Sequence, residues 1–154
     1  MNPVAAGGFS SAAATYARIR PTYARQAIGA LKELCPKGAP VLDLAAGTGI
    51  LTGQLVRAGL AVTAAEPLEA MARQLRLALP GVPLARCVAE AIAWRDHSVD
   101  MITVGQGFHW FDAERALAEA ARVLRPGGVL ALVWNVRDES TSWVAELTQL
   151  VERR

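Results

Sequence analysis

The sequence is poor in charge and in cysteine, and it contains no long hydrophobic run. Charged residues make up only 19% of its 154 residues and the formal net charge is +2, so no nucleic-acid partner is expected. No uninterrupted apolar run reaches the roughly 18 residues needed to cross a membrane, so no membrane association is expected. Cys35 and Cys87 lie far apart without the spacing of metal ligands, which indicates two reduced thiols, a cytoplasmic location and no metal site.

Acidic residues are also missing from the first 32 positions, which are rich in Ala and Ser. Basic residues do occur there, at Arg18, Arg20, Arg25 and Lys32. This composition partly resembles a mitochondrial transit peptide, but we favour an ordinary pair of helices and keep mitochondrial import as the alternative. In that pair, Pro21 ends a helix over 11–20 and Thr22 caps the next one. The charged and then apolar pattern of a secretion signal is not seen.

Apolar residues make up 53% of the chain and follow an alternation of strands and helices that suits one globular domain. Short apolar runs predict strands over 40–44, 61–66, 84–89, 99–104 and 129–134. Amphipathic segments predict helices that begin near 22, 50, 67, 112 and 141. Gly59 predicts the end of one helix, and the RPGG run over 125–128 predicts a stop and a turn. This alternation predicts an α/β fold, a Rossmann-like doubly wound parallel sheet with helices on both faces.

The turn after the first predicted strand is the best candidate for a ligand site. Asp43 ends that strand, and Ala45, Gly47 and Gly49 lie in the turn that leads into the next helix. Ligands of such sheets bind at the carboxyl ends of the strands, close to the free N–H groups of a helix N-terminus. Glu66 ends the second strand, where a carboxylate can accept hydrogen bonds from both hydroxyls of a ribose. An acid that only complements the dipole of the next helix is the alternative.

A nicotinamide site is a rival interpretation of the same turn. Its fingerprint, G-x-G-x-x-G, needs a third glycine three positions after the second one. The turn reads GTG over 47–49, but the third position after Gly49 is Thr52, and Gly53 comes one residue too late. The sequence therefore argues against a nicotinamide-dependent oxidoreductase.

In combination, several segments resemble the successive motifs of class I S-adenosylmethionine-dependent methyltransferases. These segments are VLDLAAGTG (41–49), AAEP (64–67), AEA (89–91) and RVLRPGGVLALVW (122–134). Two others, YARIRPTY (16–23) and GQGFHWFD (105–112), are similar to segments of the small-molecule group that includes trans-aconitate methyltransferase-like proteins. The resemblance covers residues 9–150 and implies the strand order 3-2-1-4-5, with a helical lid segment over 1–36 and a cofactor-binding core over 37–154.

The resemblance also implies S-adenosylmethionine as the cofactor and matches residues to its parts. Asp43 would hold the methionine part, Glu66 the ribose, and Glu90 the amino group of the adenine. The other positions implied to contact the cofactor are Ala45, Gly47, Gly49, Pro67, Met71, Ala91 and Gln106, with Tyr16, Arg20 and Tyr23 in the lid. Gln106 would lie near the methyl group.

Transfer of an activated methyl group needs mainly proximity and alignment, so few catalytic side chains are expected. His109 could take a proton from an attacking oxygen or nitrogen, and a histidine that only packs in its aromatic loop is the alternative. Arg20 could pair with a carboxylate of the acceptor because its planar fork suits that group, and a structural arginine is the alternative. We therefore expect in-line methyl transfer to a small molecule, one with a carboxylate if Arg20 binds it.

Family members usually continue past the fifth strand with two more strands and at least one helix. This sequence stops at Arg154, directly after an amphipathic helix, so we expect a core that lacks those two strands and leaves the fifth strand as an open edge. Unpaired apolar edges favour assembly. The alternative function is therefore a non-catalytic, methyltransferase-like short form that acts as a binding module or forms a homodimer through that edge.

Overall fold

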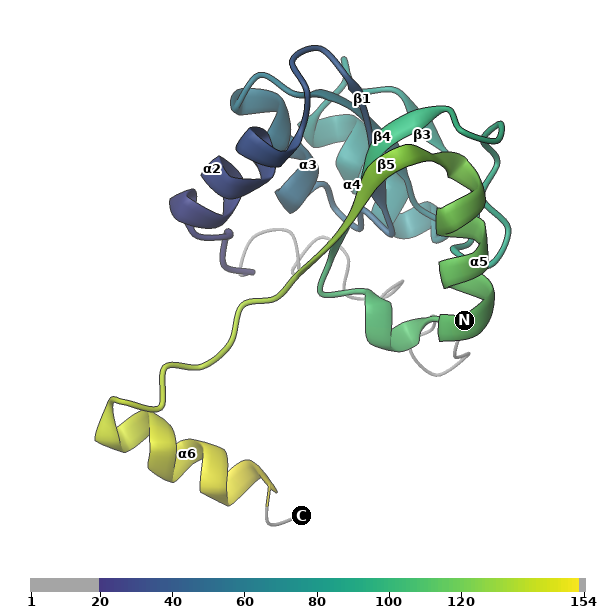
Figure 1. Ribbon diagram of the computed structural model, residues 1–154. Coiled ribbons are helices and arrows are strands. Elements are labelled where there is room, and N and C mark those ends of the chain that lie inside the picture. Colours follow the sequence, from purple (N-terminus) through teal and green to yellow (C-terminus); the bar gives the residue numbers. More distant parts are fainter. Residues whose placement is uncertain (1–19, 153–154) are drawn as a thin grey trace.

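The computed structural model describes residues 20–152 and contains a five-stranded parallel sheet (Figure 1). The strands are β1 (Pro40–Leu44), β2 (Ala61–Ala65), β3 (Leu84–Ala85), β4 (Val99–Gly105) and β5 (Leu124–Val133). Their order, β3-β2-β1-β4-β5, confirms the predicted topology, and the direction of winding switches between β1 and β4. The predicted helix over 11–20 and Tyr16 lie outside the described residues.

Helices cover both faces of the sheet, as predicted. They are α2 (Arg25–Leu34), α3 (Ile50–Arg57), α4 (Glu69–Ala78), the short 3-10 helix η1 (Phe108–Trp110), α5 (Ala113–Val123) and α6 (Ser142–Glu152). Residues of α2 and α3 pack on one face of the sheet, and residues of α5 pack on the other. Asp112 caps α5 as predicted, because its Oδ1 accepts a hydrogen bond of 3.3 Å from the backbone N–H of Arg115.

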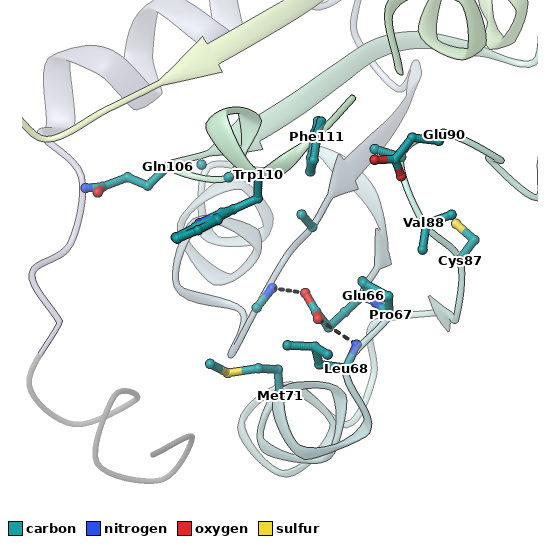
Figure 2. Close-up of a pocket in the computed structure, with 15 residues that line it drawn as sticks. Glu66, Pro67, Leu68, Met71, Cys87, Val88, Glu90, Gln106, Trp110 and Phe111 are labelled. Atoms are coloured by element: carbon teal, nitrogen blue, oxygen red, sulfur yellow. Dashed lines mark hydrogen bonds between the residues drawn. The ribbon is translucent and has the colours of Figure 1, made fainter. Parts of the chain in front are cut away.

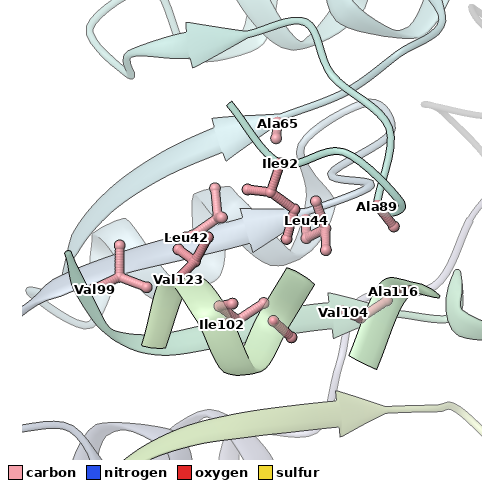
Figure 3. Packing of buried hydrophobic residues seen from close by; sticks show 11 residues of the cluster. Leu42, Leu44, Ala65, Ala89, Ile92, Val99, Ile102, Val104, Ala116 and Val123 are labelled. Carbon is pink, nitrogen blue, oxygen red and sulfur yellow. The ribbon is translucent and has the colours of Figure 1, made fainter. Parts of the chain in front are cut away.

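Successive side chains of a strand point to opposite faces of the sheet. Both kinds are buried here, because helices cover both faces. Val41 packs with Leu55 of α3 in one apolar cluster. The next residue, Leu42, belongs to the other cluster with Ile102 of β4 and Val123 of α5 (Figure 3). The central strands β1 and β4 are therefore fixed between two helix layers, and these strands carry the loops that form the candidate site.

The starts and ends of two predicted elements are wrong. The third strand, predicted over 84–89, pairs with β2 only at Leu84 and Ala85, because the chain then leaves the sheet to line a pocket. The second helix begins at Arg25 without a side-chain cap, so Thr22 does not cap it. The chain enters this helix late because the Gln54 amide holds the backbone of Tyr23 through two hydrogen bonds, of 2.8 and 2.9 Å.

The turn predicted over 125–128 is instead a bulge inside β5. This strand pairs with β4 on both sides of the run, with a register shift between Val99 and Met101. The bulge stands opposite Asp100, whose carboxylate forms an ion pair of 2.5 Å with Arg125. Gly127 takes a positive φ of 80°, a conformation that glycine adopts without steric cost. Pro and Gly here shape a bulge rather than a helix-to-strand turn.

The last predicted helix is confirmed as α6, which Figure 1 shows away from the sheet at the end of an extended segment. Its apolar side chains are largely exposed, with Trp143 and Leu150 each at 65%. Within residues 20–152, β5 pairs with β4 alone. None of the helices in this described part is long and apolar enough to cross a membrane.

Candidate cofactor site

A pocket opens at the carboxyl ends of the strands, beside the switch in winding between β1 and β4 (Figure 2). We call it the main pocket. It brings together predicted site residues from helix α4 and from the loops after four strands: Ala45, Gly47, Glu66, Pro67, Met71, Glu90 and Gln106. The remaining lining residues are ones that were not predicted as site residues: Leu68, Cys87, Val88, Ala89, Gly105, Gly107, Trp110 and Phe111.

Glu66 is the central acid of the main pocket and is only 4% exposed. Its Oε2 accepts a hydrogen bond of 2.8 Å from the backbone N–H of Gly47, and its Oε1 accepts one of 2.8 Å from the N–H of Leu68. Burial raises the pKa of Glu66, while these two N–H groups and the nearby Arg86 guanidinium act in the opposite direction. Each carboxylate oxygen can accept about two hydrogen bonds, so each retains capacity for a ligand hydroxyl.

Asp43 lies beneath the turn that follows β1 and is 1% exposed. The hydroxyl of Thr52 donates to its Oδ2 at 2.5 Å, and the hydroxyl of Thr103 donates to its Oδ1 at 2.8 Å. Burial nevertheless raises the pKa of Asp43 to about 6. Asp43 therefore ties β1 to α3 and to β4, and a role toward the methionine part of a cofactor stays a prediction.

A second, smaller pocket adjoins the main one, and Asp43, Thr48 and Arg20 line it. Ala45, Gly47 and Gly105 line both, so the two pockets adjoin at the turn. Thr48 is 6% exposed, and its Oγ1 is buried without a hydrogen-bond partner among the described residues. A buried hydroxyl of this kind costs free energy unless something bonds to it, so the second pocket is suited to a polar group.

Residues 20–24, which we call the N-terminal strap, cross beside the second pocket. Arg20 donates a hydrogen bond of 2.8 Å to Oε1 of Gln106, just past β4. Gln106 has a positive φ of 55°, which is uncommon for a residue other than glycine. Tyr23 is buried against Gly105, where a Cβ atom would come within 2.5 Å of its Oη. The predicted lid residues Arg20 and Tyr23 thus line the second pocket, and their role as a lid stays a prediction.

The two pockets together fit a nucleoside that carries a polar tail. The buried acceptors of Glu66 suit a pair of ribose hydroxyls, and apolar side chains such as Leu68, Met71 and Val88 suit a flat base. The unpartnered hydroxyl of Thr48 suits the polar end. Burial raises the pKa of the Cys87 thiol, which therefore adds a neutral surface to the wall.

The family model described as "Methyltransferase domain" matches residues 42–132, more than half of the chain. The chain belongs to this methyltransferase family. The match runs from within β1 to within β5, and it includes every loop that lines the main pocket. S-adenosylmethionine is accordingly the cofactor of this family, and the residues that line the pocket fit it.

The chain is 49% identical over 145 residues to an uncharacterized methyltransferase of Mycobacterium tuberculosis. The alignment covers 94% of this chain and 59% of that relative, so the chain spans about three fifths of the relative's length. The finer resemblance, to trans-aconitate methyltransferase-like proteins, stays a prediction.

Two solved structures share the fold and bear methyltransferase names. A "Putative Type II Methyltransferase" from Anaeromyxobacter dehalogenans is 35% identical, with a TM-score of 0.73, and the match covers 88% of this chain and 59% of that one. A "SAM-dependent methyltransferase, possible histamine N-methyltransferase" from Thermotoga maritima is 28% identical, with a TM-score of 0.65 and coverages of 95% and 68%. Neither the nicotinamide reading nor the non-catalytic short form is favoured by these relatives.

Three of the predicted site residues that the structure describes line neither the main pocket nor the second one. His109 is exposed in η1 and does not line the main pocket. Its ring is tilted against that of Trp110, with the ring centroids 4.6 Å apart. Ala91 lies just beyond the lining segment and bridges to Val88. Gly49 begins α3 with a φ of 86°, and a Cβ there would lie 2.9 Å from the Leu75 side chain. Gly49 therefore serves packing between α3 and α4, and a catalytic role of His109 stays a prediction.

Trp110 and Phe111 are the main residues that sequence reasoning missed. Both stand in the aromatic loop after β4, and their side chains line the main pocket (Figure 2). Phe111 is fixed by an edge contact of 5.7 Å with Phe108. The signal was present, since the loop reads GFHWF over 107–111, but only its histidine carries an ionisable group. The 3-10 turn points the neighbouring aromatics, rather than the histidine, into the pocket.

Proposed function

We propose that the chain is the S-adenosylmethionine-binding core of an enzyme that transfers a methyl group to a small-molecule acceptor. The observation that carries this proposal is the buried Glu66 carboxylate, held by the N–H groups of Gly47 and Leu68 at the carboxyl end of β2. Its remaining acceptor capacity is available to a vicinal diol. Family membership and the name of the Thermotoga maritima relative support the same cofactor.

The placement of the cofactor follows from the polarity of the two pockets. Glu66 would bind the ribose hydroxyls, and the base would lie between Met71 on α4 and the segment after β3. The methionine part would extend around Gly47 into the second pocket, where Thr48 offers a buried hydroxyl. The sulfonium would then lie near Gln106, at the end of β4.

When bound, the cofactor supplies a methyl group that is already activated for in-line displacement. The residues of this chain then have three tasks, which are to bind, to align and to exclude water. Trp110 and Phe111 supply an apolar wall beside Gln106, and the N-terminal strap closes the opposite side. Arg20 stands beside Gln106 at this end of the site, which supports an acceptor that carries a carboxylate.

The test is a thermal-shift titration with S-adenosylhomocysteine on the native chain and on Glu66→Ala. Ligand at about 100 times its dissociation constant should stabilise the native state by about 2.7 kcal/mol. Glu33→Ala is the matched control, because Glu33 is an exposed acid on α2, away from both pockets. We expect a clear shift for the native chain and for the control, and a much smaller one for Glu66→Ala. A folded native chain without any shift would overturn the proposal.

A further inference from the structure

The segment between β3 and β4 forms one wall of the main pocket, yet little of the sheet holds it. Residues 87–90 line the pocket, and β3, just before them, pairs with β2 at only two positions. From residue 86 to residue 98 the chain contains no helix and no strand beyond an isolated bridge between Val88 and Ala91. We call residues 87–90 the β3–β4 wall. Something other than the sheet must fix its position.

Arg122, near the end of α5, forms hydrogen bonds to the chain directly after this wall. Its Nη2 donates to the backbone oxygen of Ile92 at 2.8 Å, and its Nη1 donates to the oxygen of Trp94 at 2.9 Å. The same Nη1 forms an ion pair of 2.7 Å with Asp96. One guanidinium therefore fastens three residues of an irregular segment to a regular helix, which its planar fork of five donors makes possible.

Glu119, one turn earlier on α5, binds both Arg122 and the same segment of chain. Its two oxygens accept from Nε and Nη2 of Arg122, each at 2.7 Å, in a bidentate pair. Its Oε2 also accepts a hydrogen bond of 2.7 Å from the backbone N–H of Ile92. The backbone of Ile92 is thus held at both its N–H and its oxygen, only two residues past Glu90. Arg122 holds the pKa of Glu119 down at about 2, so the pair stays ionised over the physiological range.

The opposite end of α5 touches the wall as well. The backbone N–H of Asp112, the cap of this helix, donates a hydrogen bond of 3.1 Å to Oε1 of Glu90. Ala89 and Ile92 pack into the same apolar cluster as Ala116 of α5 (Figure 3). The N-terminal part of α5 therefore meets the β3–β4 wall, and its C-terminal part holds the chain just after the wall. The helix also directly follows the aromatic loop that contains Trp110.

We propose that Glu119 and Arg122 are positioning residues for nucleoside recognition, which set the place of the β3–β4 wall and thereby the preference for adenine. This inference rests on the proposed function, in which the base lies against that wall. Neither side chain lines the main pocket, so both act through Ile92 and the residues before it. The correctly placed wall offers the Glu90 carboxylate to the amino group of adenine, and a displaced wall does not.

The experiment compares two ligands rather than one. The dissociation constants of S-adenosylhomocysteine and S-inosylhomocysteine are measured by calorimetry, because the second ligand carries a carbonyl where adenine has its amino group. A site that hydrogen-bonds the amino group should favour the adenosyl ligand by about tenfold or more. Loss of folded protein weakens both ligands equally, so the ratio of the two constants reports the placement of the wall and not the stability.

The variants are Arg122→Met, which removes all of the guanidinium bonds, and Glu119→Gln, which leaves the N–H of Ile92 without its carboxylate acceptor. Arg125→Met is the matched control, because it removes an ion pair, with Asp100, that does not touch the wall. We expect the ratio to fall below about threefold in Arg122→Met and to decrease in Glu119→Gln, while the control keeps the native ratio. Glu119→Gln, the milder change, carries the test if Arg122→Met does not fold.

The outcomes separate this inference from the proposed function. If the native chain binds neither ligand, the proposed function fails and the inference fails with it. If the native chain prefers the adenosyl ligand and both variants keep the native ratio while they melt earlier, the pair is purely structural. That second result overturns the inference and leaves the proposed function intact.

Discussion

The backbone N–H of Gly47 donates a hydrogen bond of 2.8 Å to Oε2 of Glu66, which joins the turn after β1 to the end of β2 across the mouth of the main pocket. The same carboxylate accepts from Leu68 at the start of α4. The Glu66 carboxylate therefore holds both the turn after β1 and the start of α4. It is already placed for a ligand before any ligand arrives, which reduces the cost of binding.

Glu66→Gln tests this shared role, because it keeps the shape of the side chain and removes one acceptor. The amide NH₂ cannot accept from the N–H that faces it, so one buried donor is left unpaired. We expect the free energy of unfolding to fall by about 1–3 kcal/mol, and the affinity for S-adenosylhomocysteine to fall by about tenfold or more. Urea unfolding and calorimetry measure the two effects. Native affinity in a destabilised Glu66→Gln would show that the carboxylate serves the fold alone.

Asp43 gives the protein a predictable dependence on pH. Its pKa rises from 3.8 to about 6 on folding, so between these values the folded state binds more protons than the unfolded state. Stability from this group is therefore greatest below pH 4, falls as the pH rises to about 6 and is constant above, with a total change of about 3 kcal/mol. Burial of Glu66 acts in the same direction.

Asp43→Asn should remove the contribution of Asp43, since the amide does not ionise and can still bond to the hydroxyls of Thr52 and Thr103. We expect the variant to match the native chain near pH 4 and to exceed its stability at pH 7. Chemical unfolding across this pH range measures both profiles. Two profiles that run parallel from pH 4 to pH 7 would contradict the buried, proton-binding state of Asp43.

The site acids could be predicted from the sequence because their signals are local. Asp43 and Glu66 each end an apolar run, and a strand end is where such a fold places its ligand. The partners of Asp43 could not be predicted in this way. Thr103 stands opposite Asp43 only because β4 pairs with β1 in this register. Neither strand's own sequence indicates which strand it pairs with across a crossover.

The misplaced elements have a similar cause. A run such as RPGG signals a change of direction, but it does not say whether the change is a turn or a bulge, and the register with β4 decides this. Residues 87–89 were predicted to end a strand because they are apolar, yet they line a pocket, and Arg122 holds the backbone just after them. The fold class was thus predictable from periodicity and the strand order from the family resemblance, but the non-local contacts were not predictable from either.

Thr48→Val should separate stability from binding. Valine has nearly the same shape and lacks the hydroxyl, which is buried and unpartnered among the described residues. The variant should therefore be more stable without ligand, by about 1 kcal/mol, and it should bind S-adenosylhomocysteine more weakly. Thermal unfolding without ligand and calorimetry with it provide the two numbers. A variant that is more stable and binds as tightly as the native chain would remove Thr48 from the cofactor site.

Gly105→Ala should displace the N-terminal strap. A Cβ at this position would stand 2.5 Å from Oη of Tyr23 and 3.2 Å from Cδ2 of Leu51, so the tyrosine must move out of its buried place. We expect a loss of about 1–3 kcal/mol in the free energy of unfolding, together with weaker binding, since Gly105 and Tyr23 line the second pocket. Gly29→Ala is the control, because Gly29 lies inside α2 with nothing within 4 Å of a new Cβ. That change should stabilise the chain by about 0.5–1 kcal/mol.

A double-mutant cycle with Tyr23→Phe shows whether the Tyr23 hydroxyl is the group that the new methyl displaces. Removal of Oη relieves the shortest contact, and the next atom, Cζ of Tyr23, lies 3.1 Å from the new Cβ. The cost of Gly105→Ala should therefore be smaller by about 1 kcal/mol or more in the Tyr23→Phe background than in the native one. Urea unfolding of the four proteins gives this coupling energy. Equal costs in the two backgrounds would mean that the strap does not rest on Gly105.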